Sequence, residues 1–218
     1  MRIQNTRMLP FTADDIIKAS GVLPHKVRTI YLYGSRVYGT AKATSDYDII
    51  YVSAHLLEHE EKRATVNGAL LNIHIITPDK FKSDLKNHDI MNLECFYAPD
   101  FARIFEKEPI SFELNKKRLI KNNLAQSYSA WQNGKRKIKD FDIHKGVKGI
   151  FHSLRMLMFA DQILNNDKIV DYGVANALYT EITESDDYDW DDFKEKYLPL
   201  KQELENKLLE YGKTINAG

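Results

Sequence analysis

The sequence predicts an α/β (α+β) fold in which an N-terminal domain of strands and helices, residues 1–110, precedes a C-terminal helical domain, residues 111–218. Strand-like runs of β-branched and aromatic residues are confined to the first domain, and helical periodicity takes over from about Ser111. With 218 residues, of which 43% are hydrophobic and 28% charged, the chain can bury a core, which argues against disorder, collagen and coiled coil.

Local signals predict the elements of the N-terminal domain. Thr12, followed by two aspartates, predicts a capped helix that ends before Pro24. Three runs have the composition of strands, at residues 28–33, 46–52 and 69–77. In the C-terminal domain, the hydrophobic spacing predicts helices near residues 113–133, 141–165 and 190–211, with a shorter helix after Asp171.

Two compositional facts exclude broad classes of protein. The single cysteine, Cys95, excludes a disulfide scaffold and a cysteine-based zinc cluster, and it has no disulfide partner in the chain. No stretch approaches the roughly 18 apolar residues that a membrane helix needs, and the first residues lack a signal-peptide pattern. We therefore expect a cytoplasmic protein with no membrane partner.

The net charge of zero conceals two segments of opposite sign. Residues 115–148 carry ten Lys and Arg against two Asp, whereas residues 181–192 carry seven acids and no base. Charge runs are in general solvated helix faces. The basic segment also suits a polyanionic ligand such as RNA or a triphosphate.

The most informative stretch begins where the first predicted strand meets Gly34 and Ser35. Such a turn presents backbone amides to an anion, Gly34 permits close approach, and the Ser35 hydroxyl can donate to a phosphate oxygen. Asp46 and Asp48 follow, and in a strand residues two apart share one face. Two carboxylates on one face can hold a hard divalent cation. The combination predicts phosphoryl or nucleotidyl transfer.

This pattern resembles the nucleotidyltransferases of the DNA polymerase β superfamily, whose signature is a Gly-Ser loop followed by Asp-x-Asp on the next strand. The flanking residues make the pattern most similar to the minimal bacterial and phage enzymes, and the wider match resembles the predicted nucleotidyltransferases linked to RNA repair. The residues that carry the resemblance lie at roughly 28–160 and include Gly34, Ser35, Arg36, Tyr38, Gly39, Ser45, Asp46 and Asp48.

The resemblance implies a polymerase-β-like core, with a small mixed sheet and helices behind it, and a helical domain that closes the cleft. It implies transfer of a nucleoside monophosphate from an NTP, with Mg²⁺ or Mn²⁺ as cofactor. Gly34 and Ser35 would hold the β- and γ-phosphates, and Asp46 and Asp48 would hold the metal ion. Arg36 and Ser45 would belong to the nucleotide site.

The acceptor hydroxyl is open to several interpretations. An RNA 3′ end leads, because of the resemblance and the basic segment. A small molecule such as an aminoglycoside-type antibiotic would need an acidic pocket, which residues 181–192 could supply. A protein hydroxyl is a further alternative, and a non-catalytic nucleotide- or RNA-binding module on the same fold is another.

One departure from the family pattern concerns the third carboxylate, which family members commonly carry on the next strand. Here the polar face of that strand offers Asn72 and His74 but no acid. His74 could serve as general base or metal ligand, or could be a buried histidine bonded within the sheet. Glu94 is another candidate for the third carboxylate, or a capping or salt-bridge residue.

A basic stripe marks the helix predicted at residues 141–165. Lys145, Lys148, His152 and Arg155 recur at spacings of three and four, so they share one face. We expect this face to line the cleft and to neutralise the triphosphate or an RNA phosphate. The alternative is that it pairs with the acidic segment 181–192.

Two further motifs give weaker indications of function. Basic residues 135–139 follow Tyr128 and Trp131, a combination suited to single-stranded nucleic acid, although a plain basic helix end is slightly favoured. Residues 55–59 satisfy the H-x-x-E-H pattern of inverse zinc proteases, but so short a motif recurs by chance and lies between two predicted strands. No Walker or dinucleotide glycine motif occurs in the sequence.

Overall fold

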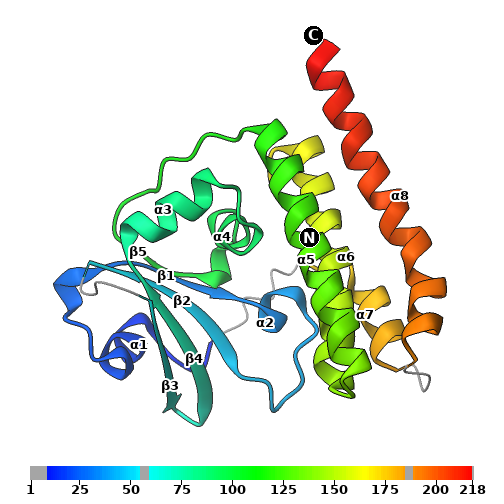
Figure 1. The fold of residues 1–218 in the computed structure, drawn as a ribbon. Coiled ribbons are helices and arrows are strands. Elements are labelled where there is room, and N and C mark those ends of the chain that lie inside the picture. Colours follow the sequence, from blue (N-terminus) through cyan, green and yellow to red (C-terminus); the bar gives the residue numbers. More distant parts are fainter. Residues whose placement is uncertain (1–8, 55–58, 185–188, 218) are drawn as a thin grey trace, which may run out of the picture. The chain divides into compact units, whose positions relative to one another are not determined.

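Five strands form one mixed sheet in the N-terminal part of the chain (Figure 1). A computed structural model describes residues 9–54, 59–184 and 189–217. The sheet has the order β3-β4-β2-β1-β5, in which β2 and β4 are parallel and the other neighbours are antiparallel. The strands are β1 (Val27–Tyr33), β2 (Tyr47–Ser53), β3 (Glu60–Val66), β4 (Ala69–Ile76) and β5 (Arg103–Glu106).

The chain divides into two compact units, each described here by itself. The first comprises residues 1–86 and 91–112, and the second comprises residues 87–90 and 113–218. The first unit holds the sheet, and the second holds the long helices. The expected α/β (α+β) class, with a mixed sheet followed by helices, is confirmed.

Two strands were not predicted from the sequence. β3 is rich in charged residues and is an edge strand, so it lacks the apolar alternation that identified the others. Its hairpin to β4 turns at Asn67 and Gly68, which have φ of 51° and 79°. An Asn-Gly pair between two extended runs is a strong hairpin signal, and it was the available clue to β3. The short strand β5 carries no comparable signal.

One face of the sheet forms the core of the first unit. Ile49, Ile73 and Ile75 are fully buried. Helix α1 (Ala13–Ser20) packs against β3 on this face, where the Lys62 ammonium donates to the Ser20 carbonyl. The predicted cap of α1 is present as a capping box between Thr12 and Asp15.

The opposite face is polar at the start of β2 and apolar toward its end. Residues directly opposite one another on neighbouring strands point to the same side, so Tyr33, Asp48 and Asn72 form one row. Farther along this face, the ring of Phe81 in α3 (Pro78–Lys86) stacks on Tyr31, with ring centroids 5.9 Å apart. The unit is completed by α2 (Ser35–Tyr38), α4 (Ile90–Phe96) and short 3-10 helices at Pro24–Lys26 and Asp100–Ala102.

Four helices make up most of the second unit, and all correspond to predicted ones. Their bounds differ from the predicted ones by a few residues. Asn115 caps the first helix, and the second begins after Phe141, whose φ of 61° is not helical. No described helix has the length and apolar character needed to cross a membrane. The helices are α5 (Lys116–Lys139), α6 (Ile143–Asn166), α7 (Asn176–Thr183) and α8 (Trp190–Ala217).

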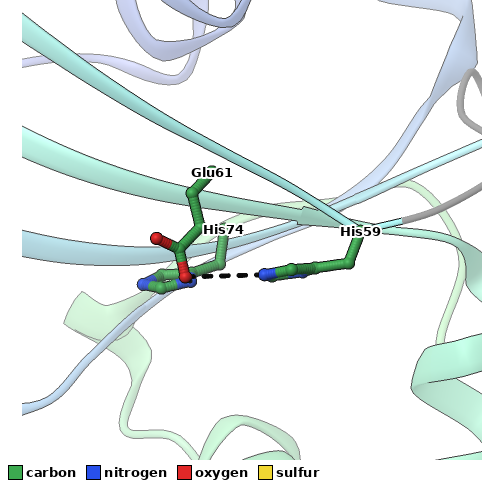
Figure 2. Close-up of side chains that lie close together, drawn as sticks. All are labelled: His59, Glu61 and His74. Atoms are coloured by element: carbon green, nitrogen blue, oxygen red, sulfur yellow. Dashed lines mark ion pairs between the residues drawn. The ribbon is translucent and has the colours of Figure 1, made fainter.

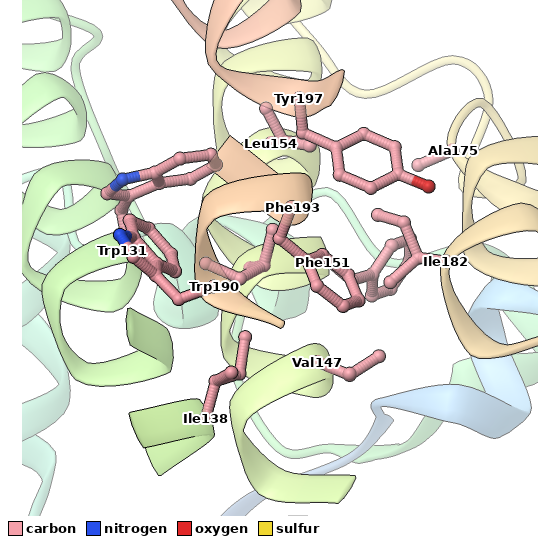
Figure 3. Close-up of a cluster of buried hydrophobic side chains, with 11 residues drawn as sticks. Trp131, Ile138, Val147, Phe151, Leu154, Ala175, Ile182, Trp190, Phe193 and Tyr197 are labelled. Carbon is pink, nitrogen blue, oxygen red and sulfur yellow. The ribbon is translucent and has the colours of Figure 1, made fainter. Parts of the chain in front are cut away.

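An aromatic cluster forms the core of the second unit (Figure 3). Trp131 of α5 and Trp190 of α8 meet edge to face, with ring centroids 5.6 Å apart. Phe151 of α6 meets Tyr179 of α7 in the same way, at 5.0 Å. Rings from all four helices therefore fix their packing.

Glycines allow α5 and α6 to approach closely. A Cβ atom on Gly146 would lie 2.5 Å from Ile138 Cγ1 and 2.8 Å from the Ile138 backbone nitrogen. A Cβ atom on Gly134 would lie 2.9 Å from the Gly146 carbonyl. The two backbones are thus in contact where side chains would otherwise separate them.

We expect Gly146→Ala to lower the free energy of unfolding by about 1–3 kcal/mol, because the added methyl group overpacks a contact made partly of backbone. Gly212→Ala in α8 is the matched control. Its Cβ atom would make only an ordinary contact, 3.5 Å from Ile120 Cδ1, so helix propensity should make it neutral or stabilising. Urea unfolding of both variants measures the difference. Equal stabilities would contradict the proposed contact.

Candidate active site

The Gly34-Ser35 turn lies directly against the Asp48 carboxylate. Gly34 links β1 to α2 with φ 78° and ψ −156°, a backbone conformation that is essentially restricted to glycine. A Cβ atom at this position would lie 2.6 Å from Asp48 Oδ2. The structure therefore brings together the two parts of the predicted motif, which are separated in sequence.

Asp46 and Asp48 lie at the start of β2. Asp48 is opposite Tyr33 of β1 on one side and Asn72 of β4 on the other. The Asn72 amide donates to Asp48 Oδ1 at 3.3 Å. Asp46, in the loop just before the strand, is partly exposed, and no described residue forms an ion pair with its carboxylate.

Arg36 shapes the loop that leads into β2. Its guanidinium donates to the backbone carbonyls of Ala43, Ser45 and Asp46 and lies over the Tyr47 ring, 4.0 Å from the ring centroid. Arg36 was expected to belong to the nucleotide site, and its role in holding this loop was not predicted. Ser45 belongs to the same loop, and its hydroxyl accepts a hydrogen bond from the Lys42 amide at 2.9 Å. A nucleotide contact of either residue stays a prediction.

The strand that carries a third carboxylate in related enzymes instead presents a hydrogen-bonded pair. The Asn72 amide lies 3.1 Å from His74 Nε2, and His74 Nδ1 lies 3.2 Å from the Glu61 carboxylate of β3 (Figure 2). Glu61 is opposite His74 in the hairpin and was missed because β3 was not predicted. A carboxylate therefore reaches His74 from the neighbouring edge strand, β3.

Glu94, the other candidate for the third carboxylate, is buried in α4. The Tyr38 hydroxyl of α2 donates to it. Burial first, and then the negative charge of Asp48, raises the pKa of Tyr33 well above its ordinary value of 10, and Glu94 and Glu61 add to the effect. Tyr33 thus remains a neutral phenol among carboxylates.

The basic stripe on α6 is not uniformly exposed. Lys145 pairs with Asp142 at 3.2 Å on the surface, and Lys148 borders a cavity of about 340 Å³ with Tyr179 of α7. Arg155, in contrast, is only 4% exposed, and its guanidinium carbon lies 5.6 Å from the centroid of the Phe151 ring. Arg155 thus lies buried beside aromatic rings of its own helix, and its contact with a triphosphate stays a prediction.

His152 lies between the exposed and buried ends of the stripe. Its Nδ1 atom is buried and has no hydrogen-bond partner among the described residues. Burial, followed by the charges of Arg155 and Lys148, holds the pKa of His152 well below its ordinary value of 6.5. The imidazole is therefore neutral at pH 7 and does not add to the positive charge of the stripe.

The structure alters the interpretation of the basic run at residues 135–139 and of the acidic segment 181–192. Trp131 is buried in the core, so it is not available to stack on nucleic acid, and residues 135–139 continue α5 instead of forming a loop. In the acidic segment, Glu181 pairs with Lys196 at 2.8 Å and not with the stripe. Residues 185–188 lie outside the described part, as do residues 55–58 of the H-x-x-E-H motif, of which His59 is described.

Residues 17–102 match the family described as Polymerase beta, Nucleotidyltransferase. The match contains both halves of the site, Gly34-Ser35 and Asp46 with Asp48. These 86 of the 218 residues thus resemble the nucleotidyltransferase domain of the polymerase β superfamily, and the long helices follow the matched segment in the chain.

The solved structures that match the chain include the following two. A nucleotidyltransferase-like protein from Exiguobacterium sibiricum 255-15 has 13% identity and a TM-score of 0.38, over 93% of this chain and 76% of that one. A spectinomycin adenyltransferase from Enterococcus faecialis, with ATP and spectinomycin, has 13% identity and a TM-score of 0.48, over 91% and 99%. A comparison with curated proteins gives no match. Since both TM-scores are below 0.5, the resemblance to the family rests on the match of residues 17–102.

We expect Gly34→Ala to destabilise the protein by at least about 1 kcal/mol more than Gly68→Ala, because only the first substitution drives a methyl group into Asp48. The two glycines have φ of 78° and 79°, but a Cβ atom on Gly68 would meet nothing within 4 Å. Both variants pay a cost for a positive φ, and the cost at Gly34 is the larger because its ψ of −156° lies in a region essentially restricted to glycine. Urea unfolding measures the combined difference, and equal losses would contradict the close approach.

The free energy of unfolding should fall as the pH drops below 6.5. Below this pH His152 is protonated in the unfolded chain but not in the native state. The free energy of unfolding therefore decreases by up to about 1.4 kcal/mol per pH unit. His152→Gln should flatten this dependence between pH 7.5 and 5.5, and His144→Gln, at an exposed position of the same helix, should not. An unchanged slope in His152→Gln would show that another group is responsible.

Proposed function

We propose that the protein is a metal-dependent nucleotidyltransferase that moves a nucleoside monophosphate from an NTP to an acceptor hydroxyl. The observation that carries this proposal is the approach of Gly34 to the Asp48 carboxylate. A phosphate held by the turn and a cation held by the aspartates would occupy adjacent positions, as transfer requires.

The turn has amides to offer to a phosphate. Within α2, the Val37 and Tyr38 amides donate to the Gly34 carbonyl, so the amides of Ser35 and Arg36 precede the first intrahelical bonds. Together with the Ser35 hydroxyl, these groups would hold the β- and γ-phosphates. The absence of a side chain at Gly34 lets a phosphate come near the backbone.

The residues present fit a hard cation. Asp46 and Asp48, two residues apart where β2 begins, would provide carboxylate oxygens, which Mg²⁺ and Mn²⁺ prefer over nitrogen or sulfur. The ion would neutralise the charge of the triphosphate when bound. The Asn72 amide donates to the Asp48 carboxylate, and Arg36 donates to the backbone of the loop that carries Asp46; these contacts would help to preorganise the metal site.

The α6 residues would add positive charge for the triphosphate. Lys145 and Lys148 are exposed and suited to this role, whereas Arg155 would act from a buried position and His152 as a neutral donor. His74 is the candidate general base. Its Nδ1 faces Glu61, which would orient the ring, and Asn72 stands between its Nε2 and Asp48.

For the acceptor, an RNA 3′ end stays the leading proposal because of the family resemblance and the basic segment 115–148. The burial of Trp131 removes one argument for it, and Tyr128 and Phe141 are exposed aromatic residues within that segment. A small molecule or a protein hydroxyl are the alternatives, and the acceptor assay below distinguishes them.

One observation favours a second candidate, a non-catalytic module that binds nucleotide or RNA. Asn72, opposite Asp48, is an amide at a position on the strand that often carries an acid in the family. A neutral amide cannot accept a proton from the attacking hydroxyl. If neither His74 nor Glu94 replaces the acid, binding would remain and turnover would not.

We expect Asp48→Asn to reduce nucleotidyl transfer by about 100-fold or more, because the amide removes a negative charge from the metal site. The assay supplies each α-labelled NTP with Mg²⁺ or Mn²⁺ to a total cell extract and measures the labelled product. Asp79→Asn, an exposed residue of α3, is the matched control and should keep full activity.

The same assay identifies the acceptor. Label that depends on Asp48 and is destroyed by RNase indicates RNA, label destroyed by protease indicates a protein, and small labelled products indicate a small molecule. High salt should weaken transfer to RNA steeply and to a small molecule much less. If the wild-type chain transfers no label under any condition but still binds NTP, the non-catalytic module is the better account.

A further inference from the structure

Two histidines and a glutamate meet on the edge hairpin of the sheet (Figure 2). His59 directly precedes β3, Glu61 lies in β3, and His74 lies opposite Glu61 in β4. Both imidazole rings point one nitrogen at the same Glu61 oxygen: His74 Nδ1 at 3.2 Å and His59 Nε2 at 3.6 Å. The three ligand atoms all lie within 4.8 Å of one another.

These separations fit three ligands of one ion. Zinc binds imidazole nitrogen and carboxylate oxygen at about 2.0–2.2 Å, so neighbouring ligands of a tetrahedral ion are about 3.4 Å apart. The two distances to Glu61 already have this size. The remaining pair of nitrogens can close because His59, with 49% of its side chain exposed, is free to adjust its ring.

We propose that His59 Nε2, Glu61 Oε1 and His74 Nδ1 bind a first-row transition-metal ion of the Zn²⁺ class, with the fourth position open. Two nitrogens and one carboxylate suit Zn²⁺, Co²⁺ or Ni²⁺ and do not suit Mg²⁺, which prefers oxygen ligands. An ion can enter from solvent, because Glu61 and His59 are exposed, while the 18% exposure of His74 keeps one ligand fixed in the sheet.

The surroundings of His74 also fit a metal ligand. Its second nitrogen, Nε2, lies 3.1 Å from the Asn72 side-chain amide. Histidine ligands commonly use their second ring nitrogen for a hydrogen bond that fixes the ring, and loss of such a partner typically costs about 10–100-fold in metal affinity. Once Nδ1 binds the ion, Nε2 carries the proton, so Asn72 would turn its side-chain oxygen toward His74 and would no longer donate to Asp48.

The three proposed ligands do not include Asp46 or Asp48, and they select a different class of ion. It does not depend on the proposed nucleotidyl transfer, and it can be tested without any substrate. The two sites share Asn72, which contacts both His74 and Asp48.

In the experiment, the full chain is titrated with Co²⁺ in a buffer that contains excess Mg²⁺. The visible absorption of the Co²⁺ complex reports binding, and Zn²⁺ is then added as a competitor. We expect one equivalent of Co²⁺ to bind with visible absorption and to be displaced by one equivalent of Zn²⁺. His59→Ala and Glu61→Gln should each weaken binding at least about 10-fold, and Asn72→Ala about 10–100-fold. His25→Ala, an exposed histidine of the same unit, should leave binding unchanged.

A variant with both Asp46→Asn and Asp48→Asn decides where the ion lies. If it binds Co²⁺ like the wild type, the ion is at the histidine site, and if it loses binding, the proposal is overturned. Unchanged affinity in both His59→Ala and Glu61→Gln would overturn it as well, as would the absence of Co²⁺ binding in the wild-type chain. His59 and Glu61 are exposed, and circular dichroism of each variant verifies that the fold is intact.

Discussion

The candidate site depends on a backbone contact, the approach of Gly34 to the Asp48 carboxylate. Any side chain at position 34 would occupy the place where the carboxylate lies, and the positive φ of 78° already disfavours one. Because this contact joins the end of β1 to the start of β2, the turn and the aspartates act as one unit. Arg36, the second residue after Gly34, donates to three backbone carbonyls of the loop that carries Asp46 and so ties this loop to the turn.

A row of polar side chains continues from this contact toward the edge of the sheet. Asp48, Asn72, His74 and Glu61 are linked by successive contacts of 3.1–3.3 Å across three strands. Alternation along each strand puts them all on one face, while the apolar residues between them fill the opposite face. The row explains how a chain without an acid at Asn72 or His74 still brings a carboxylate to this region, from β3.

The second unit shows the limit of a one-dimensional charge pattern. The spacing of Lys145, Lys148, His152 and Arg155 is regular, but their burial is not. The two lysines are exposed, whereas Arg155 is buried beside the Phe151 and Phe159 rings and the Nδ1 atom of His152 is buried. Burial changes the chemistry as well as the position, since it keeps His152 neutral. Four residues that look alike in the sequence thus differ in exposure and in charge in the folded protein.

The sequence alone determined the mixed α/β class, three of the five strands, the four long helices and the Gly-Ser and Asp-x-Asp motif, because these depend on local periodicity and on residues close in the chain. The tertiary structure decided what depends on distant residues. It revealed β3, whose polar composition hides an edge strand, and through it the partnership of His74 with Glu61 and His59. It also buried Trp131 and Arg155, since which face of a helix packs inward is set by its neighbours, and not by its own spacing.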